Sequence, residues 1–155
     1  MWDMFKARAA CGIVMQTLSP FAASSYESGI DRTPAGLWMN PHVLGFLSQL
    51  VTLITLRERG ALRVYAMAWV QASVIGSLTG AGQELIGERI HLYSSTNDEM
   101  FSEGCKAAFV FFEILAASTS RAGVGQPLGR DDEDRLKVLW KEHISTHLHS
   151  AHPSA

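Results

Sequence analysis

The sequence predicts an all-α protein, a single-domain bundle of about five helices with a long ordered loop after the first helix. Apolar residues recur at steps of three and four, as in Phe5, Ala9 and Ile13, which is helical spacing. Helix start and stop signals flank the apolar segments, and no segment alternates apolar and polar residues as a β-strand does. At 155 residues the chain fits one domain. We expect that domain to cover residues 1–150, followed by a short polar tail at 151–155.

The first helix is expected over residues 3–18, ending before Pro20. The segment 19–40 that follows is rich in Pro, Gly, Ser and Thr and is longer than most connections between helices. Because it also carries large apolar residues, Trp38 among them, it predicts a long packed loop or docking arm.

The segment 41–59 predicts a helix that is apolar nearly all round. Asn40 can cap its free amides, Pro41 suits the first helical position, and Gly60 can end it in the left-handed conformation. Only uncharged polar residues interrupt the apolar positions between these ends. Such a helix must be buried on nearly all sides. It is therefore either the central helix of a bundle or a helix shared between subunits.

A helix from about Ala61 carries a ridge of small residues at four-residue intervals, which allows close helix approach: Ala68, Ala72, Gly76 and Gly80. We expect a break at 80–82 and helix again to about Tyr93. Thr96 and Glu99 have the spacing of a capping box, which predicts a helix to about Ser120. The acidic run 131–134 predicts the start of a last helix that continues to about Ser150.

Composition and charge narrow the function classes. Hydrophobic residues make up 47% of the chain, charged residues 18%, and the net charge is −2. Because no basic cluster is present, a nucleic-acid partner is not expected. The two cysteines, Cys11 and Cys105, lie in helical patterns, and so sparse a pair favours a reducing, cytoplasmic location. The first residues mix charged and apolar side chains, so no signal peptide for export is expected.

His143 and His147 predict a candidate metal site. Four residues apart on a helix, they can direct both imidazoles at one ion, and they share the inward face of the last helix. His42 can supply a third ligand to a zinc or iron ion. One early histidine and a late His-x-x-x-His pair loosely resemble the DinB-type metal-binding helical bundles, although no Gly-containing continuation or further helix follows the pair. The alternative is a set of histidines at the core edge, bonded to neighbouring groups.

Two further places carry carboxylates of interest. Glu84, Glu88 and His91 share one helical face, and Glu88 and His91 have the Glu-x-x-His spacing that ferritin-like di-iron bundles use twice, whereas here it occurs once. The alternative is a solvated polar face. Glu113 lies within a strongly apolar run and is either a catalytic carboxylate with a raised pKa or the end of a wet helix edge.

The leading functional hypothesis is a non-enzymatic helical protein that acts through self-association or as a subunit of a larger assembly. Its expected interface residues come from the apolar helix, the small-residue ridge and the loop: Trp38, Phe46, Leu50, Ala68, Ala72, Gly76 and Gly80. The alternative is a metal-dependent helical-bundle hydrolase or transferase that uses His143 and His147 with His42 or with Glu88 and His91. A second alternative is peripheral membrane binding through the first helix, where Trp2 and Phe5 accompany Lys6 and Arg8.

Overall fold

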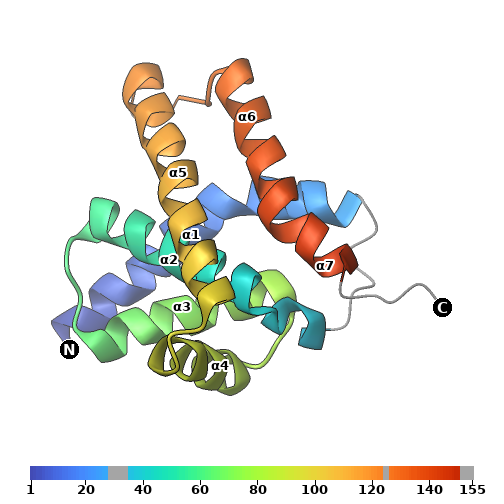
Figure 1. The fold of residues 1–155 in the computed structure, drawn as a ribbon. Helices are drawn as coiled ribbons and strands as arrows, with labels where there is room; N and C mark the ends of the chain where they lie inside the picture. Colours follow the sequence, from blue (N-terminus) through green and yellow to red (C-terminus); the bar gives the residue numbers. More distant parts are fainter. Residues whose placement is uncertain (28–34, 124–125, 151–155) are drawn as a thin grey trace.

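The computed structural model describes residues 1–27, 35–123 and 126–150, and the prediction of an all-α fold is confirmed (Figure 1). No β-strand occurs in these ranges. The elements follow in the order α1 (Trp2–Glu27), the 3-10 helix η2 (Ala35–Met39), α2 (Pro41–Arg59), α3 (Val64–Thr79), α4 (Gln83–Ser95), α5 (Glu99–Ala122), α6 (Arg130–Trp140), the π-helical turn η3 (Lys141–Ser145) and α7 (Thr146–Ser150). The tail predicted at 151–155 lies outside the described residues.

Helix α2 is the central helix of this chain, which is the first of the two arrangements that its apolar surface predicted. Asn40 caps it, with its side-chain oxygen accepting from the amides of His42 and Val43, and Gly60 ends it. Seven of its apolar residues have no exposed surface: Val43, Leu44, Phe46, Leu47, Leu50, Val51 and Ile54. Leu56, in its last turns, is 43% exposed. One chain therefore buries most of the apolar surface of this helix without a second subunit.

Helices α2 and α5 cross at two glycines. A Cβ atom at Gly45 would collide with the backbone of Phe101, and one at Gly104 would collide with the carbonyl of His42. Because only glycine lacks this atom, the two backbones come into direct contact at the crossing. This contact fixes the position of the first turn of α2 against α5.

Helix α3 packs beside α1 and is joined to α2 by a polar contact. The amide nitrogen of Gln71 donates to the Thr52 hydroxyl at 2.9 Å and to the Ser48 carbonyl at 3.3 Å. Helix α3 ends at Gly80, whose φ of 76° is left-handed, as the predicted break requires. Of the described helices, none alone has the length and hydropathy to cross a bilayer. By composition α2 and α3 together would, but they meet at 119°.

The predicted loop 19–40 begins too early, because α1 continues through Pro20 to Glu27. Pro20 has no amide hydrogen, so the carbonyl of Gln16 loses its helical hydrogen bond. Both residues are exposed, so water can bond to that carbonyl instead. Burial of Phe21, Ala22 and Ser25 beyond the proline stabilises the extra turns. Residues 28–34 of the loop are outside the described ranges. In η2, Trp38 packs into the core with 3% of its surface exposed.

The second half of α5 and helix α6 extend together away from the other helices (Figure 1). Helix α5 begins two residues later than the predicted capping box places it, because Asp98 caps it by accepting from the Phe101 amide. Thr96 instead ends α4. At its other end α6 is anchored to the core through Trp140, which is 1% exposed. The predicted last helix is thus present as α6, η3 and α7 in succession.

Candidate functional site

Three of the histidines predicted as metal ligands meet at one place. His42 is the second residue of α2, His143 lies in η3 and His147 in α7. The His42 Nε2 atom lies 3.1 Å from His143 Nδ1, a hydrogen-bond distance across 101 residues of sequence. The His147 ring stacks on the His42 ring, with centroids 3.9 Å apart and planes 11° apart. The fold therefore gathers three imidazoles at the junction of α2 with the end of the chain.

The local structure explains why these rings meet. Asn40 caps α2, and the close crossing of α2 with α5 at Gly104 holds the His42 backbone in place. On the other side, the Thr146 amide donates to the Lys141 carbonyl five residues earlier, which makes η3 a π-helical turn. Single π-helical turns inside α-helices are frequent at functional sites.

The core forms one wall of this histidine cluster. The Phe46 ring lies 5.5 Å from the His143 ring with planes 20° apart, and Phe46 in turn meets Trp140 edge-on at 6.0 Å. His42 itself is 8% exposed, whereas His143 and His147 are half-buried. The cluster therefore has a dry side formed by aromatic rings and a side open to solvent.

Burial keeps the cluster uncharged. It lowers the pKa of His42 to about 4, an effect that His147 and His143 reinforce when protonated and that the negative charge of Glu103 opposes. Burial also lowers the pKa values of His143 and His147. All three imidazoles are consequently neutral at pH 7 and retain a lone pair that can accept a proton or bind a cation.

As it stands, the arrangement fits two ligands of one metal ion and not three. Zinc–nitrogen bonds of about 2.0–2.1 Å place tetrahedral ligands about 3.3 Å apart, close to the His42–His143 separation. A bound ion lies in the plane of each imidazole, so the parallel rings of His42 and His147 cannot both direct a lone pair at it. Accordingly, no set of three or more His, Cys, Asp or Glu side chains within the described ranges is arranged to hold a metal ion.

The other predicted chemical residues lie apart from this cluster. Glu84, Glu88 and His91 are exposed on α4, and Glu113 is exposed on α5, as expected of solvated helix faces. The side chain of His149 and all of His152 are outside the part of the chain that the structure describes.

The predicted interface residues divide into two groups. Phe46, Leu50, Trp38 and Ala72 are buried in the core of this single chain. The ridge is also used within the chain. Gly76 is half-buried beside the Ala81 backbone and the Ile86 side chain, while Ala68 and Gly80 are exposed.

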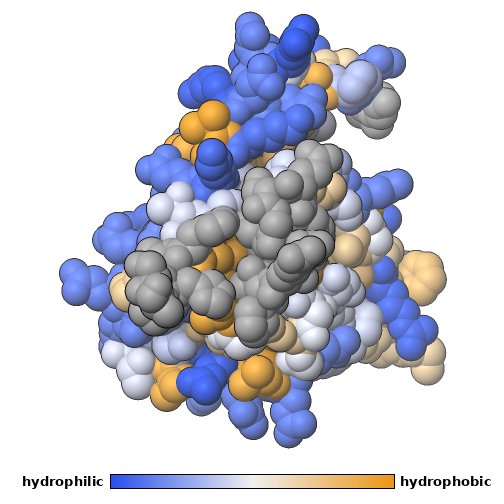
Figure 2. Space-filling model, turned by 90° about the vertical axis from the view of Figure 1, so that its right-hand side faces the viewer, coloured by the Kyte–Doolittle hydropathy of each residue, from blue (hydrophilic) through white to orange (hydrophobic). Residues whose placement is uncertain are grey.

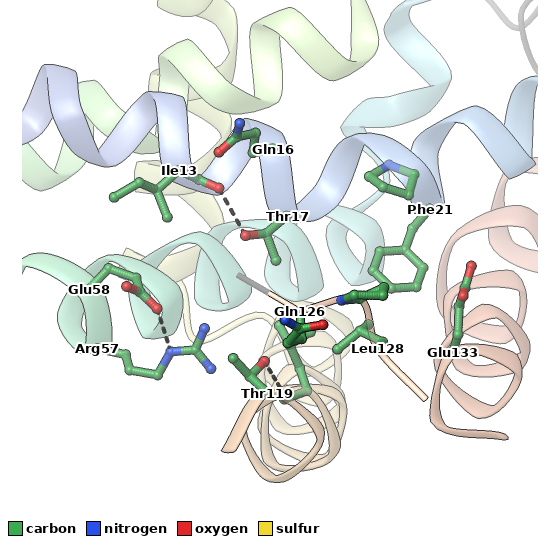
Figure 3. Close-up of a pocket in the computed structure, with 13 residues that line it drawn as sticks. Ile13, Gln16, Thr17, Phe21, Arg57, Glu58, Thr119, Gln126, Leu128 and Glu133 are labelled. Atoms are coloured by element: carbon green, nitrogen blue, oxygen red, sulfur yellow. Dashed lines mark hydrogen bonds and ion pairs between the residues drawn. The ribbon is translucent and has the colours of Figure 1, made fainter. Parts of the chain in front are cut away.

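A cavity of about 510 Å³ lies between the end of α2, α1, the end of α5 and the segment before α6 (Figure 3). Phe21, Leu115 and Leu128 contribute apolar walls. Arg57 extends into it and is paired with Glu58, with Nε 2.8 Å from the carboxylate. Sequence periodicity gave no signal for this cavity, because its residues come from four separate segments.

A second hollow, of about 400 Å³, lies between the outer faces of α5 and α6. Val110 and Ile114 line it from α5, and Val138 and Leu139 from α6. Val110 and Val138 are 52% and 65% exposed. We call this surface the α5–α6 groove.

No protein-family model matches this sequence, and neither the curated proteins nor the solved structures include one that is significantly similar to it.

Proposed function

We propose that this protein binds a divalent transition-metal ion through His42 and His143, with His147 as the third ligand once its ring has rotated out of the stack. The observation that carries the proposal is the 3.1 Å approach of His42 Nε2 to His143 Nδ1 from two distant parts of the chain. That separation is close to the edge of a tetrahedral zinc site, about 3.3 Å.

The state of the imidazoles supports the same function. Metals bind neutral histidine, and the burial that lowers the pKa of His42 to about 4 removes any need to expel a proton at pH 7. Imidazole ligands suit Zn²⁺, Cu²⁺, Ni²⁺ and Co²⁺ better than Mg²⁺ or Ca²⁺. The third ligand requires the half-buried His147 ring to turn out of its stack, whereas His42 is held by the core.

Three histidine ligands leave a coordination position open. A zinc ion held in this way lowers the pKa of a bound water and so supports hydrolysis. The chain's own contribution is the dry wall formed by Phe46 and Trp140, which shields one side of the cluster from bulk water. Hydrolysis or group transfer at this cluster is the activity that follows from metal binding.

The test is a calorimetric zinc titration of protein prepared without an affinity tag, with metal content measured after dialysis. We expect one ion per chain in the wild type and in His91→Asn, because His91 is exposed on α4. His143→Asn is expected to lose binding, since it removes one of the two preset ligands. A double variant His149→Ser/His152→Ser must keep it. Sub-stoichiometric zinc, or unchanged binding in His143→Asn, would refute the proposal.

A second candidate function is self-association through the α5–α6 groove. Phe109, Val110 and Val138 expose apolar side chains on these two helices, although they were not among the predicted interface residues. On the side of the molecule where α6 and α7 lie, hydrophobic residues appear as separate areas in a largely hydrophilic surface (Figure 2). Asp134 and Arg135 border the groove, so two copies related by a twofold axis can pair opposite charges.

Sedimentation equilibrium at micromolar concentration tests this association. A dimer is expected in the wild type, and Val110→Glu/Val138→Glu is expected to be monomeric because it places charges in the groove. Leu92→Glu, at an exposed position on α4, is the matched control and should remain dimeric. A monomeric wild type would exclude this candidate.

A further inference from the structure

We propose that the first turns of α1 and α3 form a surface that binds anionic phospholipid bilayers. This surface, called here the Trp2–Tyr65 surface, contains Trp2, Phe5, Val64 and Tyr65. Their exposed fractions are 69%, 67%, 88% and 53%. Four large apolar side chains exposed at the starts of two neighbouring helices are the kind of surface that marks a protein or membrane contact.

The structure joins the two helix starts into one surface. The Arg63 Nε atom lies 3.2 Å from the carboxylate of Asp3, and this ion pair connects the residue before α3 to the first turn of α1. Trp2 and Phe5 stack with ring centroids 5.9 Å apart and planes 19° apart. Val64 and Tyr65 directly follow Arg63. The ion pair thus holds the first turns of α1 and α3, which carry these exposed apolar side chains, close to each other.

The charge of these segments favours a negatively charged membrane. Residues 1–26 contain Lys6 and Arg8 and a single acid, Asp3, while residues 60–82 contain Arg63 and no acid. The two segments therefore carry a net charge of +2 within a chain whose net charge is −2. Asp3 is already paired with Arg63, so the remaining cations, Lys6 and Arg8, are available to lipid phosphates and carboxylates.

The residue types fit the boundary between headgroups and acyl chains. Trp and Tyr are enriched at membrane interfaces because a flat ring can enter the acyl region while its polar atom stays among the headgroups. An anionic soluble protein would also satisfy the cations, but it offers no acyl layer for Trp2, Phe5 and Val64 to enter. The combination of exposed aromatic residues with flanking cations is typical of interfacial helices.

The test is co-sedimentation of the full chain with two kinds of vesicle, pure phosphatidylcholine and equal parts of phosphatidylcholine and phosphatidylserine. We expect binding to the mixed vesicles that weakens with added salt, and little binding to the pure ones. Trp2→Ser/Phe5→Ser is expected to lower the partition coefficient about tenfold or more, because both side chains leave the acyl region. Both are exposed, so folding, checked by circular dichroism, is expected to persist.

The matched control is Leu92→Ser/Met100→Ser, which removes two large exposed side chains, 45% and 47% exposed, near acidic residues. It is expected to bind as the wild type does. Quenching of Trp2 fluorescence by iodide, isolated by comparison with Trp2→Phe, should fall when mixed vesicles are added. Absence of binding to mixed vesicles, equal binding to both vesicle types, or equal losses in the two double variants would overturn the proposal.

Discussion

The indole Nε1 of Trp140 donates a 2.7 Å hydrogen bond to the hydroxyl of Ser25, and the two residues lie 115 positions apart in the sequence. Both side chains are buried. The bond joins the last turns of α1, beyond Pro20, to the junction of α6 and η3, directly before the turn that carries His143. It therefore connects the end of the first helix to the segment that supplies two of the three histidines of the cluster.

Ser25→Ala tests this connection, because it leaves the indole N–H unpaired in the core. We expect a loss of about 1–3 kcal/mol in the free energy of unfolding, measured by urea denaturation. Ser77→Ala is the control, since Ser77 is exposed on α3 and bonds only locally. Its effect should stay within about 0.5 kcal/mol. Equal losses in the two variants would show that the buried bond contributes nothing.

Gly45→Ala and Gly104→Ala are expected to be among the most damaging single substitutions in the chain. Each adds a Cβ where the α2–α5 backbones touch, so the helices must separate. We expect a loss of about 3 kcal/mol or more, or failure to fold. Gly87→Ala on α4 meets nothing within 4 Å and should gain up to about 1 kcal/mol, because alanine is the better helix former. Thermal denaturation distinguishes these outcomes, and unchanged melting of Gly104→Ala would contradict the close crossing.

Stability is expected to fall as the pH is lowered through the histidine range. The pKa of His42 is 6.5 when unfolded and about 4 when folded, so the unfolded chain binds a proton first. The stabilisation is fully present above pH 6.5, is lost as the pH falls towards 4, and amounts to about 3 kcal/mol. The lowered pKa values of His143 and His147 act in the same direction.

The measurement is the free energy of unfolding as a function of pH in wild type, His42→Gln and His91→Gln. The slope should flatten in His42→Gln and persist in His91→Gln, whose imidazole is exposed. A slope that is the same in all three proteins would assign the acid sensitivity to other groups.

Gln71→Leu is expected to cost about 1 kcal/mol in unfolding free energy, because α3 loses its hydrogen bonds to Thr52 and to the Ser48 carbonyl. Gln83→Leu, at an exposed position on α4, serves as the comparison. If Gln71→Leu is instead as stable as the wild type, apolar packing between α2 and α3 compensates for the lost bonds.

Local patterns predicted most of the helices, and tertiary packing accounts for the main departures. The bounds of α2 could be predicted from the sequence, because the capping effects of Asn40, Pro41 and Gly60 involve only residues close to them in the chain. Pro20 predicted an early end to α1. The helix continues beyond it because Phe21 and Ser25 are buried against residues far along the chain, and a local sequence pattern does not contain such contacts. Thr96 was predicted as the cap from its capping-box spacing to Glu99, whereas Asp98 caps α5 by accepting from the Phe101 amide.

The histidine cluster could be assembled from sequence only in part. Helical spacing places His143 and His147 together, and His42 was chosen for its place at the start of a buried helix. The stacking of His147 on His42 and the π-helical turn depend on three-dimensional packing, for which the sequence has no periodic signal. A related point holds for the predicted interface residues. Apolar character shows that Phe46 and Leu50 are covered, but not whether the same chain or a partner covers them.

The π-helical turn has a consequence for sequence variation in this chain. Its i to i−5 bond accommodates one residue more than the α-helical bond does. A homologue with a one-residue deletion between Lys141 and Ser145 is therefore expected to form an uninterrupted α-helix whose later residues keep their direction, because the wider turn has absorbed the extra residue. His147 would then still lie on the side that faces His42. The same deletion within the regular α-helix α6 would instead turn everything beyond it by about 100° and move His143 and His147 away from His42.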